Sequence, residues 1–454
     1  MTELYGTQVL ADWTATLTLD VVPAAVRQVA VRSLIDTLGV MLAGVSQPPA
    51  VQARALVRMT GGTGRANVVG SAWRKAAPAA TFANAVAAHA WDFDDNCYAG
   101  FVHGSAVIVP AALAVAQQSG ATGEQLLTAL VAGAECQYRL GMALGQTLYD
   151  HGWWTTSVLG TVGACAAAAR LLGLDSTATA NALALAIGGT GGMKSVFGCD
   201  AKPLLAGKAA EAGVLAALLA QHGARGPLDT LEHRYGLATL YNEGKLSPAW
   251  LSAPQDDWCL LSPGIDIKRI PVCLSSHAAV DAVMAIVIEH CLSPEDIAHI
   301  SCDVPPLVIA NLIYSRPQNS QQAQFSMPFA IAASLCFGEL TLAHLERATL
   351  SDSRVMAIMS TVSVCSGSRW HDADLLRRAP EGAWVEVTTR DGSTYRDFRI
   401  KAHGSALSPL SDDELGRKFL QCAGRVLDAR SVCKVLDRLW KVSALPTLDA
   451  ILDC

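Results

Sequence analysis

Apolar residues recur at helical spacing through most of the first 265 residues of this chain, and this pattern limits the fold more than any other feature. Between residues 22 and 43, Val26, Ala30, Leu34 and Leu38 form one apolar stripe, with Pro23 in the first turn. The same periodicity predicts helices over residues 126–144, 156–174, 178–187 and 206–222. These segments are rich in alanine and glycine, so their backbones can approach closely. The sequence therefore predicts a large all-helical domain over residues 1–265.

The pattern changes after Pro263-Gly264, where short runs with β-strand character appear. They cover residues 297–304, 362–365, 384–389 and 395–400, with helical segments over 278–291 and 329–337 between them. The last two runs flank Asp391-Gly392, which is typical of a hairpin turn. We therefore expect a smaller α+β lid domain over residues 266–404. A helix capped by Ser411 and Glu414 would return residues 405–454 to the first domain, which makes the fold class mainly α.

Charge and cysteine usage exclude several classes of protein. Only 16% of residues are charged, the net charge is −6, and there is no run of Lys and Arg, so we expect neither a nucleic-acid partner nor binding to an anionic membrane. The 13 cysteines include no C-x-x-C pair, which favours reduced thiols in a cytoplasmic enzyme over disulfides or a zinc site. The N-terminus lacks the pattern of a signal peptide, and apolar runs such as 106–116 are too short for a membrane span.

A cluster of acids and imidazoles between residues 89 and 106 is the strongest candidate for a site. Asp92, Asp94 and Asp95 lie there with His89 and His103, between two apolar helical segments. Acids in such surroundings are costly to bury unless they are paired or used in chemistry. Either the aspartates cap the helix that follows and His89 is a core histidine, or His103 is an acid/base group oriented by a carboxylate. The pattern leaves both interpretations open.

Three further segments combine polar groups with predicted helix starts, and each also has a purely structural interpretation. Tyr149, His151, Trp153 and Trp154 precede a helix and form either a pocket wall or core filling. Residues 188–208 resemble a phosphate loop but have the wrong spacing for one.

Lys194 and Lys202 of that glycine-rich segment have different predicted roles. Lys194 fits a solvated lysine, whereas Lys202 among apolar neighbours could act as a base. Further along, Lys268, Arg269 and His277 lead into a helix and could receive a carboxylate, or could mark a domain hinge.

Taken in order, these four segments resemble the motifs of the 2-methylcitrate dehydratase family (MmgE/PrpD). The matching stretches are His89–Asp95, Gly152–Ser157, Lys202–Ala210 and Lys268–His277. The resemblance implies a large helical domain with an α+β lid, a homodimer, and no metal or organic cofactor. It also implies chemistry at carbon in a small di- or polycarboxylate, by dehydration, decarboxylation or epimerisation.

The chain departs from the family pattern at three positions. Trp154 and Leu205 stand where the family carries histidines, and Asn96, taken as a substrate-binding residue, stands where Thr is common. Removal of a hydroxyl or a carboxylate needs more assistance than epimerisation, which needs a base on one face of a carbon and an acid on the other. These losses favour a cofactor-independent isomerase, an epimerase of an aminopolycarboxylate such as iminodisuccinate.

In that mechanism the α-proton passes between Lys202 and His103, with Tyr149 or His151 as rivals for either role and Asp92 orienting His103 or Lys202. On the substrate side, Lys268, Arg269 and His277 would neutralise carboxylates, while Trp153 and Trp154 exclude water. Two alternatives remain: a lyase of the 2-methylcitrate dehydratase or cis-aconitate decarboxylase type, and a non-catalytic carboxylate-binding protein.

Overall fold

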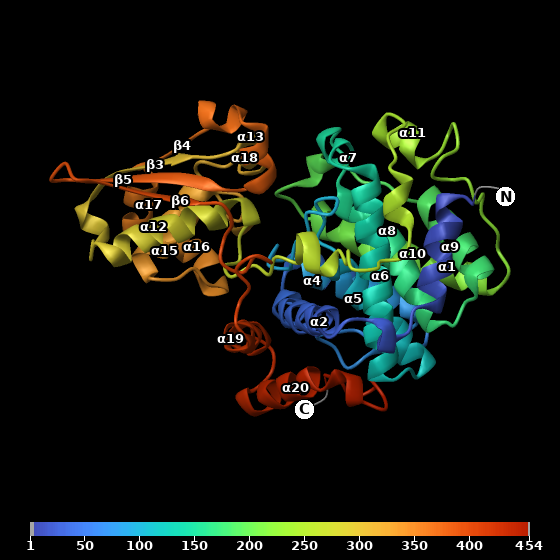
Figure 1. Ribbon diagram of the computed structural model, residues 1–454. Helices are drawn as coiled ribbons and strands as arrows, with labels where there is room; N and C mark the ends of the chain where they lie inside the picture. Colours follow the sequence, from blue (N-terminus) through green and yellow to red (C-terminus); the bar gives the residue numbers. More distant parts are fainter. Residues whose placement is uncertain (1–3, 453–454) are drawn as a thin grey trace. The chain divides into compact units, whose positions relative to one another are not determined.

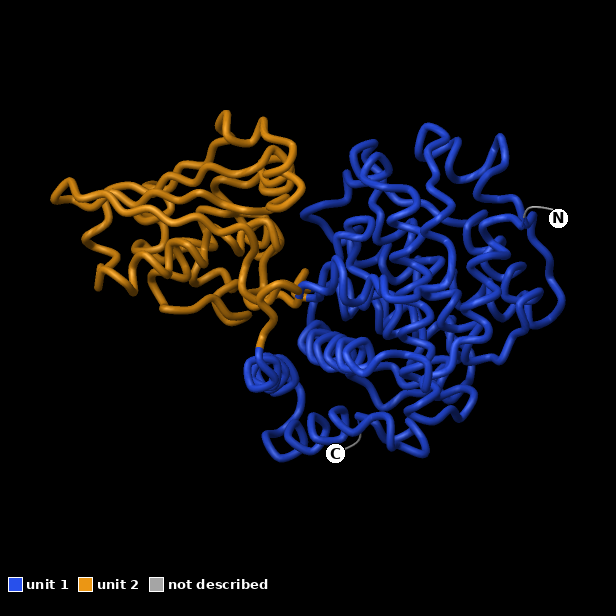
Figure 2. Tube along the Cα trace, in the orientation of Figure 1, with its two compact units in different colours: residues 1–90, 94–266, 411–454 blue, residues 91–93, 267–410 orange. Residues whose placement is uncertain are grey.

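The computed structural model describes residues 4–452 and divides them into two compact units (Figure 2). The second unit comprises Ile267–Leu410 together with Trp91–Phe93, and the first unit contains the rest. Within the second unit, the side chain of Gln324 donates a hydrogen bond of 2.6 Å to the carbonyl of Trp91. The sequence did not separate residues 91–93 from the helical domain.

The first unit is built almost wholly from helices (Figure 1). They are α1 (Gly6–Thr16), α2 (Ala24–Gly44), α3 (Pro48–Thr60), α4 (Ala77–His89), α5 (Ser105–Ser119), α6 (Gly123–Leu144), α7 (Thr147–Asp150), α8 (Thr155–Leu171), α9 (Ser176–Gly188), α10 (Ala201–Gln221), α11 (Leu237–Asn242), α19 (Asp412–Ala423) and α20 (Ala429–Trp440).

Helix α8 lies in the middle of this unit and packs against α5, α6, α9 and α10. Its residues from Thr155 to Ala169 are all buried. Small residues allow this packing: a Cβ at Gly213 of α10 would lie only 2.5 Å from the carbonyl oxygen of Thr161 on α8. The alanine- and glycine-rich composition therefore serves close helix contacts, as the sequence predicts.

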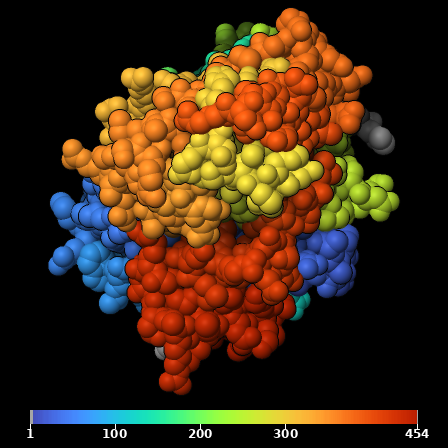
Figure 3. All heavy atoms as spheres, turned by 90° about the vertical axis from the view of Figure 1, so that its left-hand side faces the viewer, coloured from blue at the N-terminus to red at the C-terminus, as the bar shows by residue number. Residues whose placement is uncertain are grey.

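The C-terminal helices belong to the first unit and pack against α2. The predicted capping box of Ser411 and Glu414 opens α19. Lys418 on that helix pairs with Asp36 on α2 at 2.6 Å, and both side chains are buried. The C-terminal segment, red in Figure 3, forms the outer surface of this part of the unit.

Two details of the first unit differ from the sequence prediction. A short antiparallel pair, β1 (Ala66–Asn67) and β2 (Arg74–Lys75), interrupts the helices, because two-residue strands are too short to show a periodicity. Helix α10 begins at Ala201, five residues before its predicted start, since Pro203 in a first turn does not break a helix.

Helix α10 also bears on the prediction about membrane spans. By length and composition alone α10 is long and apolar enough to cross a bilayer. The same is true of the bent pair of α2 and α3 if the two helices are taken as one span. The prediction that every apolar run is too short was therefore wrong for α10. The structure buries 56% of its apolar window, and a core helix of a folded protein passes the same test.

The second unit combines a four-stranded sheet with short helices. The strands are β3 (Ile297–Asp303), β4 (Val362–Cys365), β5 (Ala383–Thr389) and β6 (Thr394–Arg399). The helices are α12 (His277–Glu289), α13 (Pro306–Asn311), α14 (Ser320–Ala323), α15 (Met327–Phe337), α16 (Arg347–Leu350), α17 (Ser353–Met359) and α18 (Ala373–Arg378).

The strand order is β4-β3-β5-β6, in which β3 and β4 are parallel and the other neighbours antiparallel. The predicted turn at Asp391-Gly392 joins β5 and β6, and Gly392 has a φ of 89°, which glycine adopts readily. Buried and half-buried residues alternate along β5, and α12 packs against β5 and β6. The mixed α+β character of this segment is therefore confirmed.

Candidate active site

The acidic cluster lies on the loop that joins α4 to α5. His89 is the last residue of α4, and Asp95 anchors the other end of the loop by accepting hydrogen bonds from the backbone N–H and the hydroxyl of Ser105. The backbone of Asn96 forms a bridge with Asp266, with N···O distances of 2.9 and 2.8 Å. Of the two interpretations that the sequence left open, helix capping is therefore correct for Asp95, which caps α5.

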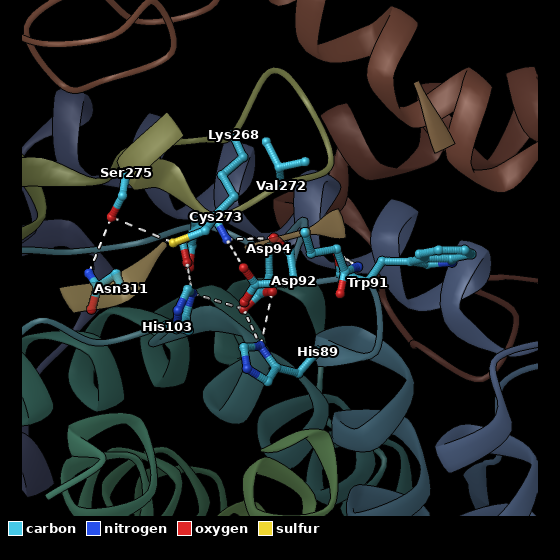
Figure 4. Close-up of polar contacts among 12 residues, drawn as sticks. His89, Trp91, Asp92, Asp94, His103, Lys268, Val272, Cys273, Ser275 and Asn311 are labelled. Atoms are coloured by element: carbon cyan, nitrogen blue, oxygen red, sulfur yellow. Dashed lines mark hydrogen bonds and ion pairs between the residues drawn. The ribbon is translucent and has the colours of Figure 1, made fainter. Parts of the chain in front are cut away.

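Asp94 holds both histidines of the loop (Figure 4). The Nδ1 atom of His89 lies 2.9 and 3.0 Å from the two oxygens of Asp94, and Nδ1 of His103 lies 3.4 Å from one of them. The side chains of His89 and Asp94 are completely buried, whereas that of His103 is 16% exposed. Asp94, which received no catalytic role in the sequence-based mechanism, is thus the carboxylate of this cluster that contacts His103.

The hydrogen bonds assign the tautomer of His103. Its Nδ1 lies 2.9 Å from the backbone carbonyl oxygen of Asp95, which can only accept a hydrogen bond. Nδ1 therefore carries the hydrogen, and Nε2 is the nitrogen that can take up and release a proton. The neighbouring carboxylate of Asp94 favours the protonated ring. This arrangement suits a general acid/base.

The ligand atoms of His89, Asp94 and His103 lie within 4.8 Å of one another, close enough to consider a metal ion. The donor set fits one poorly, because Nδ1 of His103 is directed at the Asp95 carbonyl and Nδ1 of His89 at both oxygens of Asp94. A metal would have to displace the hydrogens that these contacts require. We therefore derive no step through a metal.

Trp154 and Lys202 extend this cluster within the first unit. The ring of Trp154 lies 5.5 Å from that of His89, and the ammonium of Lys202 lies 5.9 Å from the Trp154 ring and 5.2 Å from the Phe197 ring. Trp154 is 1% exposed and Lys202 5%. The tryptophan that replaces a family histidine thus packs beside the buried histidine of the loop. Lys202, in the first turn of α10, is a buried cation among aromatic rings.

The other residues predicted around Trp154 have different neighbours. Trp153 stacks on Tyr241 at 3.8 Å, and His151 pairs with Glu243 at 2.8 Å. His151 is also more than a third exposed. Its predicted role as a rival acid/base remains a prediction.

Tyr149 contacts Lys194, a residue that was predicted from the sequence to be solvated. The ammonium of Lys194 lies 3.5 Å from the centre of the Tyr149 ring, and burial lowers the pKa of Lys194 from its usual value. Lys194 was interpreted as a solvated lysine. It is held in place by backbone pairing, since its N–H donates to the carbonyl of Gly152 at 2.9 Å.

The glycine-rich segment before Lys194 packs directly on the start of α8. The carbonyl of Gly192 accepts from the N–H of Trp154 at 3.1 Å. A Cβ at Gly192 would lie 2.7 Å from the Cβ of Ser157, and its φ of 141° is one that other residues rarely adopt. These glycines do not form a phosphate loop but have a structural function. Their close approach to the start of α8 places Lys194 beside Tyr149.

In the second unit, Asp92 forms a buried ion pair with Lys268. The Lys268 ammonium lies 3.1 Å from the Asp92 carboxylate and also donates to the Asp92 carbonyl, with side-chain exposures of 0% and 4% (Figure 4). Asp92 adopts a φ of 49°, which is uncommon outside glycine, asparagine and aspartate. Asp92 was predicted to orient His103 or Lys202, but the ion pair that the structure shows for its carboxylate is with Lys268.

The remaining candidates of the second unit are also engaged. Arg269 pairs with Asp281, and Nε2 of His277 lies 3.2 Å from the carbonyl of Val272. Asp281 also accepts a hydrogen bond of 2.8 Å from the backbone N–H of His403. Their predicted roles in binding substrate carboxylates remain predictions.

The burial of Asp95 has a consequence that can be measured as pH-dependent stability. Desolvation raises the pKa of Asp95 from 3.8 to about 7. The folded state therefore resists ionisation of this group, and stability is lost as the pH rises from about 4 to about 7. Asp95→Asn should abolish this loss, so its stability relative to the parent should improve by about 2 kcal/mol between pH 5.5 and pH 8. Thermal unfolding at both pH values measures it.

The matched control is Asp437→Asn, because the Asp437 side chain is 70% exposed and pairs only with the next turn of its helix. Its stability relative to the parent should not change between the two pH values. An Asp95→Asn variant that follows the pH dependence of the parent would show that the group is ionised throughout and that the inferred protonation is incorrect.

Comparison with known protein families identifies the chain. The family model described as "MmgE/PrpD N-terminal domain" matches residues 8–248. The family model described as "MmgE/PrpD C-terminal domain" matches residues 270–441. The chain belongs to the MmgE/PrpD family. The resemblance predicted from the four motifs is thereby confirmed, including its extent over nearly the whole chain.

Curated relatives of this MmgE/PrpD protein include decarboxylases. Cis-aconitate decarboxylase of Homo sapiens is 30% identical over 386 residues, covering 81% of this chain and 78% of the relative. The Mus musculus protein of the same name is 27% identical, covering 82% and 78%. Cis-aconitate decarboxylase-like protein oryM of Aspergillus oryzae is 26% identical over 453 residues, covering 94% and 92%.

These comparisons support an enzyme that acts on a polycarboxylate and favour the lyase alternative over the epimerase interpretation. None of the three names refers to iminodisuccinate or to an isomerase. The epimerase that the two missing histidines favoured is not supported by these comparisons. It was an inference from missing groups, whereas the group that remains, His103, has a well-defined acid/base geometry.

Proposed function

We propose that this protein is a lyase that releases CO₂ from cis-aconitate or a closely related unsaturated tricarboxylate. The names and coverage of the three relatives support the reaction class. The observation that carries the proposal is the contact of His103 Nδ1 with the Asp95 carbonyl and with Asp94. It leaves Nε2 of His103 as a proton donor whose protonated form a carboxylate stabilises.

Decarboxylation of such a substrate needs a proton at carbon. When the bond to the departing carboxylate breaks, its electron pair forms a new carbon–carbon double bond. The original double bond shifts, and its far carbon takes up a proton. In the proposal the protonated ring of His103 supplies this proton from Nε2 and becomes neutral, with Nδ1–H still bonded to the Asp95 carbonyl.

The retained carboxylates need a cation to pair with. Lys202 is the proposed partner, since it is 5% exposed and lies among the rings of Trp154 and Phe197. A cation in such a poorly hydrated position interacts strongly with a carboxylate. Trp154, beside His89, would keep water away from the acid.

The site favours loss of CO₂ over loss of water. Dehydration requires an acid for the departing hydroxyl as well as a base for the proton. Trp154, which stands where the resemblance leads us to expect a histidine, carries no group able to exchange protons near neutral pH. A single acid with a nearby cation meets the smaller requirement of decarboxylation.

The test offers three substrates separately to the full chain in D₂O: cis-aconitate, 2-methylcitrate and iminodisuccinate. We expect CO₂ release from cis-aconitate, with one deuterium in the product at the carbon that took up the proton. Water loss from 2-methylcitrate, or stereoinversion of iminodisuccinate, without CO₂ release from cis-aconitate would overturn the proposal. The first outcome would point to the dehydratase, and the second would restore the epimerase.

A further inference from the structure

The second unit contains a cavity of about 850 Å³ outside the clusters described above. Its walls come from residues 315–318 after α13, from Pro328 at the start of α15, and from α16, α17 and the first residue of β4. The volume lies in the range of about 300–1,000 Å³ that is usual for small-molecule sites. None of the lining residues belongs to the His103 or Lys268 clusters.

The charges around this cavity are of one sign. Arg316 and Arg347 line it, and no acidic residue does. Within the described residues 4–452, neither arginine forms an ion pair, whereas the nearby Arg354 is paired with Asp352 at 2.8 Å. Two guanidinium groups without carboxylate partners at one cavity form a receptor for an anion, because each can bind a carboxylate or phosphate in bidentate fashion.

The wall that carries Arg316 is held in place before any ligand arrives. The side chain of Gln318 donates to the Arg316 carbonyl at 3.1 Å, and the Gln318 N–H donates to the side chain of Gln322 at 2.8 Å. Asn319 then caps α14. Because the loop is already ordered, binding does not have to fix it.

The rest of the lining is apolar enough to hold a carbon skeleton. Leu350, Met356, Met359 and Val362 contribute to it, and Met356 is 57% exposed. Methionine side chains adapt to irregular apolar ligands. An exposed methionine beside two unpaired arginines favours a ligand with both an apolar body and acidic groups.

We propose that this cavity binds an organic anion that has an apolar carbon body and at least two acidic groups. The acidic groups pair with Arg316 and Arg347, and the body lies on Met356 and Met359. This site goes beyond the proposed decarboxylation, because it uses none of the residues assigned to that reaction.

The test is hydrogen–deuterium exchange of the full chain with two probes. Suberate carries two carboxylates on an aliphatic chain, and inorganic pyrophosphate carries similar charge without one. We expect suberate to protect residues 313–319 and 347–360 from exchange, and pyrophosphate to protect them weakly. Arg316→Gln and Arg347→Gln should each weaken the apparent affinity for suberate about tenfold, as expected for the loss of one charged pair.

Arg354→Gln is the matched control, because it removes an exposed guanidinium from the same region that is already paired and does not line the cavity. It should leave suberate binding unchanged, and all three variants should keep the parent's CO₂ release and melting temperature. Equal protection by pyrophosphate would overturn the proposed carbon body. Protection that survives in the Arg316→Gln/Arg347→Gln double variant, or that is absent in the parent, would overturn the site.

Discussion

Replacing His103 with asparagine is expected to lower kcat for CO₂ release by about a hundredfold to ten-thousandfold. The asparagine amide can still donate to the Asp95 carbonyl, which Nδ1 of His103 contacts at 2.9 Å. The loop should therefore keep its conformation, while the proton of Nε2 is lost. Steady-state kinetics with cis-aconitate measures the effect, and circular dichroism and melting temperature confirm that the fold is unchanged.

Asp94→Asn distinguishes a positioning residue from the acid itself. It keeps the volume of a fully buried side chain but removes the charge beside the rings of His89 and His103. We expect a smaller loss, about tenfold in kcat, with the alkaline limb of the pH–rate profile moved to lower pH. If His103→Asn retains near-parental kcat, or if Asp94→Asn lowers kcat without moving the profile, His103 is not the acid.

The sequence predicted the elements of this fold well where the signal is local. The capping box of Ser411 with Glu414 and the hairpin at Asp391-Gly392 are both present. Each depends on residues close together in the chain, so tertiary contacts have little opportunity to override it. The same holds for the four strands and for α12 and α15 of the second unit.

The candidate site was less predictable because its contacts join distant residues. The acidic segment is neither helical nor a strand, and Asp92, with its positive φ, directs its side chain to Lys268, 176 positions away. The carboxylate that contacts His89 and His103 is therefore that of Asp94. Lys194 was misjudged for the same reason, because it is the pairing of Trp153 with Met193 that brings it to Tyr149.

The ion pair that results from this turn should be the most sensitive point of the second unit. Lys268→Met leaves the Asp92 carboxylate, 4% exposed, without its cation. We expect a loss of about 3–5 kcal/mol in unfolding free energy, because a buried charge without a partner retains its full desolvation cost. Urea denaturation, followed by a probe in the second unit, measures the loss.

The double variant Asp92→Asn/Lys268→Met tests the cause of that loss. It removes both charges, and asparagine tolerates the positive φ of 49° as aspartate does, so no backbone strain is added. Most of the stability should return, since a buried pair replaced by neutral groups is often close to neutral in free energy. Arg269→Met, which removes a side chain that is 33% exposed and leaves Asp281 at 11% exposure, should cost less than Lys268→Met. A double variant no more stable than Lys268→Met would mean that the lysine stabilises the unit through its packing, and that its charge contributes little.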